Sequence, residues 1–302
     1  MGPLEEVRAM PDPEHTTEHT AVLVGVTDEE DVHAALVFAV AEARWRGAGI
    51  HLVHVTPRVP LGPVGQDEVD GAGRDLLERT AAAVRAELAG GLEITTELVH
   101  GSVAPALVDA SVRAGLVVVQ HQRMGRPGLV VTLSVTNPVA ALCGVPVVAV
   151  PAAWREDHAG PITVGADDGD GAPVVVGAAL TEARIRGCGV RVLHAWHYRD
   201  PYDQLVFDEP AGEAHTDERR RLLADQLAPV LRVYDDVPTE LVVVHERAAE
   251  ALVRAGERSS LLVVGRHRHT IPLGPHLGSV VRAVLRHATC PVMVVDPVPR
   301  TG

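Results

Sequence analysis

The sequence predicts an α/β protein built from two consecutive homologous domains. Residues 42–47 (EARWRG) recur 140 positions later as residues 182–187 (EARIRG), so the chain contains an internal repeat. A repeat of this length indicates two domains, because solenoid repeats span only about 20 to 50 residues. Aromatic residues make up 3% and hydrophobic residues 46% of the 302 residues, which favours aliphatic strands covered by alanine-rich helices.

The first half begins with a short apolar strand. Residues 21–26 form a continuous apolar run of strand length, and a polar break at 27–31 follows. The next apolar residues recur at helical spacing and share one face. They are Val32, Leu36, Ala39, Val40 and Ala43. Gly47 ends this helix, and residues 50–55 form the next strand.

Strands and helices continue to alternate through both halves. Stretches rich in Pro and Gly at 56–73 and 197–212 precede helices expected at 74–89 and 217–232. The remaining strands are expected at 94–99, 116–119 and 145–150, and then at 240–244, 261–264 and 291–295. This alternation predicts parallel sheets with right-handed crossovers. Such sheets bind ligands beyond the carboxyl ends of their strands, here between the first and fourth strands.

The domain boundaries follow from the same pattern. We expect the chain to divide into an N-terminal tail (1–19), a first domain (20–151), a linker (152–160), a second domain (161–296) and a C-terminal tail (297–302). At about 150 residues for each half, both domains are large enough to bury a core.

The composition excludes several classes of function. A net charge of −13 argues against a general nucleic-acid or anionic-membrane surface. The chain contains no lysine, which excludes the lysine-containing P-loop and Schiff-base chemistry. The three cysteines form no C-x2-C pair, which is typical of reduced thiols in the cytosol. We find neither a secretory signal nor an apolar run of about 18 residues, and therefore expect a cytoplasmic protein without a membrane span.

At the level of motifs, the chain resembles a tandem universal stress protein. The resemblance rests on residues 182–187, on Leu193-His194, on Gly278-Ser279 and on residues 290–292 (CPV), and it covers residues 20–296. It implies that each half is a Rossmann-like or flavodoxin-like domain with a five-stranded parallel sheet of order 3-2-1-4-5. It also implies that the apolar last strands pair antiparallel, which in a tandem chain makes an intramolecular pseudo-dimer.

The resemblance further implies an adenine-nucleotide site in the second half. Asp167 stands where the family has an Asp after the first strand, and Ala195 follows His194 where the backbone contacts the adenosine end. The family's loop G-x2-G-x9-G-[ST] matches this chain from Gly265 to Ser279, with Arg268 replacing the second glycine. The candidate ligand-binding residues are Asp167, Ala195, Gly265, Arg266, Arg268, Gly278 and Ser279. The expected ligand is ATP, alone or with Mg²⁺.

Two residues leave the behaviour of this loop open. Glycines in such a loop let backbone N–H groups approach phosphate oxygens, and the following helix N-terminus adds a positive dipole. The Arg268 side chain either blocks that approach or supplies a charge-assisted bond to the same phosphate. The Ser279 hydroxyl either caps the helix or binds a phosphate. The alternative to a nucleotide site is a structural loop that caps a helix.

The first half has lost more of the motif. Its corresponding loop has Gln120, Arg123 and Leu133 at the three glycine positions, although Ser134 is retained. Thr27 stands where the second half has Asp167. We therefore expect the first half to act as a scaffold and partner for the second.

No catalytic constellation is evident, so we do not predict an enzyme. There is no G-x-S-x-G elbow and no lysine to clamp a phosphate. His267, His269 and His276 lie close in sequence but match no closed metal motif, and we predict no metal site. The leading hypothesis is a stress-linked protein that binds or senses ATP through its second domain. The alternatives are a ligand-free protein that acts through an unknown regulatory protein, and a weak ATPase; self-association through the last strands is also expected.

Overall fold

The fold consists of two α/β halves that follow one another in the chain. The computed structural model describes residues 21–27, 32–58, 63–88, 91–121, 135–156, 160–197, 209–266 and 277–298. The first half contains β1 (Ala21–Val26), α1 (His33–Arg46), β2 (Ile50–Thr56), α2 (Pro63–Leu88), β3 (Ile94–His100), α3 (Val103–Ala110), β4 (Ala114–His121), α4 (Thr136–Leu142) and β5 (Val147–Pro151). The second half contains β6 (Ile162–Gly165), α5 (Ala172–Arg186), β7 (Val190–Trp196), α7 (Glu209–Val233), β8 (Thr239–His245), α8 (Ala248–Gly256), β9 (Leu261–Gly265), α9 (Ser279–His287) and β10 (Val292–Val295).

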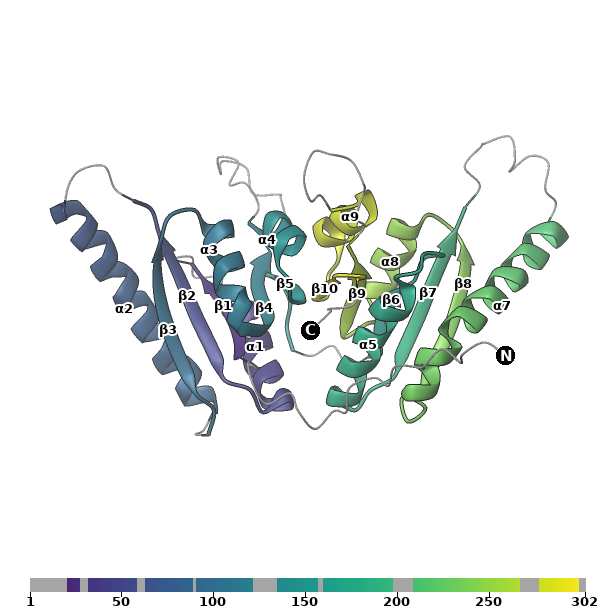
Figure 1. Ribbon diagram of the computed structural model, residues 1–302, viewed down its shortest axis with the longest axis horizontal. Helices are drawn as coiled ribbons and strands as arrows, with labels where there is room; N and C mark the ends of the chain where they lie inside the picture. Colours follow the sequence, from purple (N-terminus) through teal and green to yellow (C-terminus); the bar gives the residue numbers. More distant parts are fainter. Residues whose placement is uncertain are drawn as a thin grey trace, which may run out of the picture.

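All ten strands join into one continuous sheet. The strand order is β3-β2-β1-β4-β5-β10-β9-β6-β7-β8, and neighbours within each half are parallel. Figure 1 shows β5 and β10 at the centre, with α2 and α7 at the two ends. The predicted fold class, α/β with two similar halves, is confirmed.

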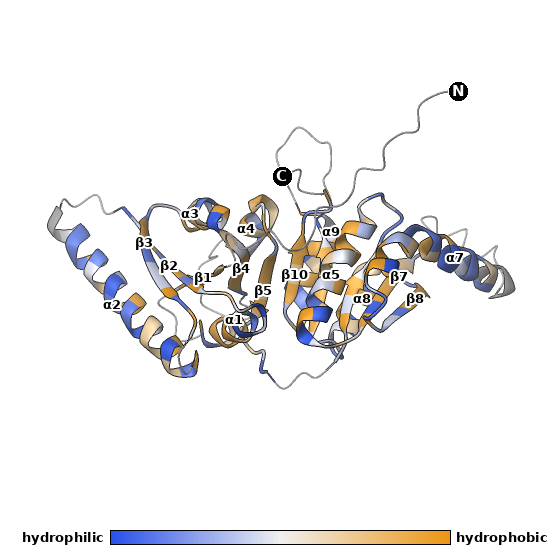
Figure 2. Ribbon diagram, turned by 60° about the horizontal axis from the view of Figure 1, so that its bottom comes forward, coloured by the Kyte–Doolittle hydropathy of each residue, from blue (hydrophilic) through white to orange (hydrophobic). Residues whose placement is uncertain are grey.

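Helices cover both faces of the sheet and create two apolar layers. One layer packs the sheet against α1, α2, α5 and α7, and the other packs it against α3, α4, α8 and α9. Along β1, Val22 and Val24 belong to the first layer and Leu23 to the second, because successive side chains of a strand point to opposite faces. Figure 2 shows the hydrophobic central strands and the largely hydrophilic outer surfaces of α2 and α7.

The last strands of the two halves pair with each other. β10 lies antiparallel to β5, with Met293 opposite Val148 and Val292 opposite Ala149. Every residue of β5 and β10 is buried. The expected antiparallel pairing within one chain is therefore present, and it removes two apolar edges that would otherwise attract other strands.

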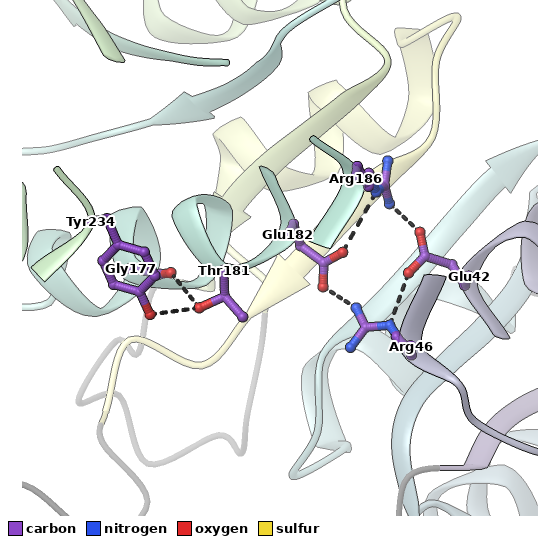
Figure 3. Close-up of polar contacts among 7 residues, drawn as sticks. All are labelled: Glu42, Arg46, Gly177, Thr181, Glu182, Arg186 and Tyr234. Carbon is purple, nitrogen blue, oxygen red and sulfur yellow. Dashed lines mark hydrogen bonds and ion pairs between the residues drawn. The ribbon is translucent and has the colours of Figure 1, made fainter. Parts of the chain in front are cut away.

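A buried ion network joins the halves on the face covered by α1 and α5. Arg46 Nε lies 2.9 Å from Glu42 Oε2, and Arg186 Nε lies 3.6 Å from Glu182 Oε2. Each arginine also contacts the carboxylate of the other half, Arg46 that of Glu182 and Arg186 that of Glu42 (Figure 3). These four residues come from the repeated segments 42–47 and 182–187. The motif that marks the repeat in the sequence therefore forms a reciprocal contact between its two copies.

The charged groups of this network are buried, which makes their ion pairs important for stability. The Glu42 side chain is fully buried and the Arg186 side chain is only 5% exposed, so neither charge is solvated by bulk water. Burial opposes the charge on Arg46, but Glu182 and Glu42 hold the pKa of that guanidinium above its ordinary value. Burial also raises the pKa of Glu182, and the nearby Glu42 carboxylate raises it further. Each charge thus depends on its partners in the other half.

The second helix of each half starts earlier than the sequence predicted. The expectation of a loop at 56–73 was wrong in part, because α2 begins at Pro63; α7 likewise begins at Glu209 rather than 217. Proline fits the first turn of a helix, where its missing N–H is not required. Gly73 is needed for close packing, since a Cβ there would lie 2.8 Å from Leu98 Cδ1 and 2.9 Å from His54 Cδ2. Tertiary packing outweighs the low helix propensity of glycine.

Asp70 of α2 forms a polar cluster at the carboxyl ends of β2 and β3. His100 Nε2 lies 2.9 Å from Asp70 Oδ2, Gln66 Nε2 donates to Oδ1 at 2.9 Å, and the Thr56 hydroxyl donates to Oδ1 at 3.2 Å. The hydrogen bond from His100, followed by that from Gln66, lowers the pKa of Asp70 from its ordinary value of 3.8. The cluster attaches α2 to the outer strands of the first half.

We expect the Asp70→Asn variant to be less stable than the wild type at neutral pH. In acid, this difference in stability should disappear. A lowered folded-state pKa means that the folded protein binds a proton more weakly than the unfolded chain does. The stabilisation by Asp70 is therefore complete above its unfolded pKa of 3.8 and disappears as the pH falls through the folded pKa. Thermal midpoints of wild type and Asp70→Asn between pH 7 and pH 2 measure this. The control is Asp75→Asn on the exposed face of α2; a gap between wild type and Asp70→Asn that did not narrow in acid would contradict the assignment.

Candidate functional site

A cavity of about 590 Å³ opens at the carboxyl ends of β6 and β9 in the second half. Its walls come from the ends of β6, β7 and β9, from the first turns of α5, α8 and α9, and from Pro297 after β10. β6 and β9 are neighbours in the sheet but are far apart in sequence, which is the position where open α/β sheets bind ligands.

One part of the cavity wall is backbone at the N-terminus of α9. α9 starts with Gly278 as its N-cap and Ser279 as its first residue, and no side chain caps it. The first N–H groups of a helix have no partner within the helix and carry partial positive charge. The start of α5 differs, because Ala172 N donates to the carbonyl oxygen of Gly169 at 3.0 Å, Val174 N donates to that of Gly171 at 3.1 Å, and Pro173 between them has no N–H. The α9 side of the cavity is therefore the one suited to an anion.

Gly265 at the end of β9 keeps this part of the cavity open. A Cβ at Gly265 would lie 2.8 Å from Val175 Cγ2 of α5. Any larger residue must displace Val175 or project into the cavity. Ser279 is exposed, and its hydroxyl makes no hydrogen bond within the described part of the chain.

Two carboxylates, Asp167 and Asp168, line the cavity from the turn after β6. Asp167 Oδ1 accepts a hydrogen bond of 3.0 Å from Gly169 N, which holds the turn after β6. Asp168 Oδ2 lies 2.8 Å from Arg219 NH1 of α7, and its Oδ1 lies 3.5 Å from His194 Nε2. Because His194 Nδ1 lies 3.0 Å from the carbonyl oxygen of Ala166, Nδ1 carries the proton and Nε2 faces the carboxylate.

Arg266 lines the cavity, but its guanidinium is engaged elsewhere. NH1 donates to the carbonyl oxygens of Ala141 at 2.9 Å and Cys143 at 2.8 Å, both in the first half, and NH2 contacts the Asp296 carboxylate. NH1 and NH2 are therefore held by the first half and by Asp296, whereas Nε is buried and has no hydrogen-bond partner among the described residues. The role of Arg266 in ligand binding stays a prediction.

The structure brings most of the predicted residues together around one cavity. Six of the seven line it, namely Asp167, Ala195, Gly265, Arg266, Gly278 and Ser279. Arg268 lies outside the described residues, as do His267, His269 and His276. Sequence reasoning did not include His194 or Pro297 in the site, and it considered Asp168 only as an alternative to Asp167 for holding Mg²⁺ beside a triphosphate. Asp168 and His194 are each adjacent to a predicted residue, so their spacing was a usable signal, whereas the approach of Pro297 depends on the path of the chain after β10.

At the corresponding place in the first half, a side chain approaches the start of α1. Gln120 is the penultimate residue of β4 and corresponds to Gly265 of β9, and its Oε1 lies 3.5 Å from Ala35 N in the first turn of α1. The residue that corresponds to Val175 is Ala35, whose smaller side chain leaves room for the glutamine. Thr27 is exposed, and Arg123, Leu133 and Ser134 lie outside the described residues. The first half thus satisfies an N–H at the start of α1 with its own amide.

Two further properties of the described residues bear on function. None of their helices is long and apolar enough to cross a membrane. No group of three or more His, Cys, Asp or Glu side chains in the described ranges is arranged to hold a metal ion.

Known proteins resemble the chain over nearly its whole length. The model of the universal stress protein family matches residues 19–151 and again residues 159–296. A universal stress protein of Mycolicibacterium smegmatis is 33% identical over 289 residues, which cover 91% of this chain and 97% of that protein. Universal stress protein Rv1996 of Mycobacterium tuberculosis is 28% identical over 298 residues, covering 90% and 94%. The crystal structure of a universal stress protein from Archaeoglobus fulgidus has the same fold, with a TM-score of 0.67, 15% identity and coverage of 92% and 97%. The chain therefore belongs to the universal stress protein family, with two copies of the family's domain in one polypeptide.

Proposed function

We propose that this protein binds an adenine nucleotide, with ATP as the first candidate, in the cavity of its second half, and that it does so without catalysis. The observation that carries the proposal is the N-terminus of α9, which no side chain caps, together with Gly265 and Gly278 around about 590 Å³ of space. Backbone N–H groups at such termini bind phosphate without a lysine, which this chain lacks. The Asp167 and Asp168 carboxylates in the lining can accept hydrogen bonds from amino or hydroxyl groups of a nucleoside.

The same geometry argues for binding rather than hydrolysis. Among the described residues that line the cavity, the only arginine is Arg266, and its guanidinium contacts the first half and Asp296. Phosphoryl transfer depends on charged groups that stabilise the transferring phosphate, and the described lining offers none that is free. A stress-linked binding or sensing role in the cytoplasm fits this arrangement.

The direct test is the ligand content of the purified protein. Freshly purified protein is denatured, and the supernatant is analysed by anion-exchange chromatography with mass detection. We expect stoichiometric nucleotide, and after its removal we expect Mg-ATP at about 100 times its Kd to raise the thermal midpoint by about 5 °C or more. No bound nucleotide together with no thermal shift would instead support a ligand-free protein that acts through protein contacts. Release of ADP during incubation would support the weak ATPase.

We expect Gly278→Leu to abolish binding of ATP. Gly278 has φ −59° and ψ 160°, a conformation open to any residue, so leucine acts by occupying the space before α9 rather than by straining the backbone. Isothermal titration with ATP measures the loss. Gly71→Leu is the matched control, because a Cβ at Gly71 in α2 meets nothing within 4 Å. Unchanged affinity in Gly278→Leu would remove this helix N-terminus from the site.

A further inference from the structure

Arg266 connects the end of strand β9 to the other half of the molecule. The residue is 8% exposed, and NH1 donates to the carbonyl oxygens of Ala141 and Cys143 at 2.9 and 2.8 Å. Both acceptors lie at the C-terminal end of α4, where carbonyl groups lack partners within the helix and carry partial negative charge. The guanidinium therefore serves as a C-terminal cap for a helix of the first half.

The contacts of Arg266 also reach two walls of the cavity. Gly265, which precedes it, forms the floor beside Val175. Its other partner, Asp296, precedes Pro297, which lines the cavity and packs on Gly171 so closely that a Cβ at Gly171 would lie 2.5 Å from Pro297 Cβ. Arg266 thus fixes the end of β9 and the segment after β10 against the same point on the first half.

The corresponding residue of the first half has a different side chain. His121 follows Gln120 as Arg266 follows Gly265, and His121 Nδ1 lies 3.4 Å from the Thr136 hydroxyl of its own half. Equivalent residues of both halves build the Glu42–Arg46–Glu182–Arg186 network, whereas the Arg266 contact uses an arginine that the first half does not have at this position. This contact makes the second half's cavity depend on the neighbouring half.

We propose that Arg266 is a positioning residue that couples ligand binding in the second half to helix α4 of the first half. This inference rests on the proposed nucleotide site. A ligand that orders the backbone at Gly265 and Pro297 also orders the guanidinium between them and, through it, the end of α4. Because coupling between two sites is reciprocal, a change at α4 must alter ligand affinity by the same factor that the ligand imposes on α4. The first half then regulates ligand binding in the second half, and α4 is the element of the first half that responds to the ligand.

The test compares two arginines that both bridge the halves. In full-length protein, Arg266→Gln removes the link to the cavity, whereas Arg46→Gln removes a contact of the ion network, which lies outside the cavity lining. We expect Arg266→Gln to raise the Kd for ATP about tenfold, within the usual range of allosteric coupling, and Arg46→Gln to leave the Kd unchanged. Equal weakening by both variants would show that general loosening of the interface is responsible and would overturn the inference.

Hydrogen exchange provides a readout that a purely structural role would not change. ATP is expected to slow amide exchange at residues 136–143 in wild type and in Arg46→Gln, but not in Arg266→Gln. If ATP protects α4 equally in all three proteins, Arg266 does not carry the coupling. If the wild type binds no ATP, the proposed function is wrong, but the role of Arg266 can still be tested. The test is then hydrogen exchange measured without nucleotide. Faster exchange at residues 266 and 279–282 in Arg266→Gln alone supports positioning, whereas unchanged rates refute it.

Discussion

Replacing Arg186 with methionine is expected to lower the free energy of unfolding by about 3–5 kcal/mol. Arg186 NH2 contacts the Glu42 carboxylate, which is fully buried, and the variant leaves that charge with Arg46 as its remaining partner. The Arg186 guanidinium also lies 5.0 Å from the ring centroid of Trp45 and 5.4 Å from that of Phe38. Urea unfolding followed by circular dichroism and tryptophan fluorescence measures the loss.

The control lies in the same helix and the same motif. Arg184 pairs with Asp236 at the surface, where both side chains are about half exposed and water screens the charges. We expect Arg184→Met to change the unfolding midpoint far less than Arg186→Met does. The single variant Arg186→Met leaves two buried carboxylates, Glu42 and Glu182, with one arginine. The double variant Arg186→Met with Glu42→Leu removes the excess carboxylate, and it should be more stable than Arg186→Met alone. If the double variant were less stable than the single one, the cost would come from lost packing and not from a buried charge.

Much of the fold could be predicted because its signals are local. Strands such as β1 and β9 are continuous apolar runs, and the repeated segments 42–47 and 182–187 align the two halves directly. Those segments predicted a repeat but not the ion network, because their partners come together only when β5 and β10 pair. The start of α2 was missed since Gly73 suggested a loop, and its role in packing against Leu98 is visible only in three dimensions.

The candidate site also contains features that the sequence predicts and features that it does not. Gly265, Gly278 and Ser279 follow from loop spacing, and all three line the cavity. The side-chain contacts of Arg266 could not be predicted, because they depend on how close α4 of the other half lies. The partnership of Asp168 with Arg219 similarly depends on the path of α7. Short sequence motifs predict the backbone features of a site, whereas tertiary structure determines which partners long charged side chains contact.

Gly265→Gln, which copies the first half's Gln120, is expected to weaken ATP binding by about 100-fold or more, equivalent to about 2.8 kcal/mol. The new side chain either projects into the cavity or displaces Val175, since a Cβ at Gly265 would lie 2.8 Å from Val175 Cγ2. Overpacking of this kind typically destabilises a protein by about 1–3 kcal/mol. Loss of binding in this single variant could thus reflect either a filled site or a damaged fold.

The double variant Gly265→Gln with Val175→Ala separates these causes. It reproduces in the second half the first half's arrangement, in which Gln120 Oε1 lies 3.5 Å from the backbone N of Ala35. We expect the smaller alanine to restore the thermal midpoint to near that of wild type while ATP affinity stays at the level of the single variant. Val175→Ala alone should retain ATP binding, because it enlarges the cavity without filling it. Recovery of ATP affinity in the double variant would mean that the glutamine acted through misfolding, and it would refute the expectation that a glutamine side chain at position 265 blocks the site.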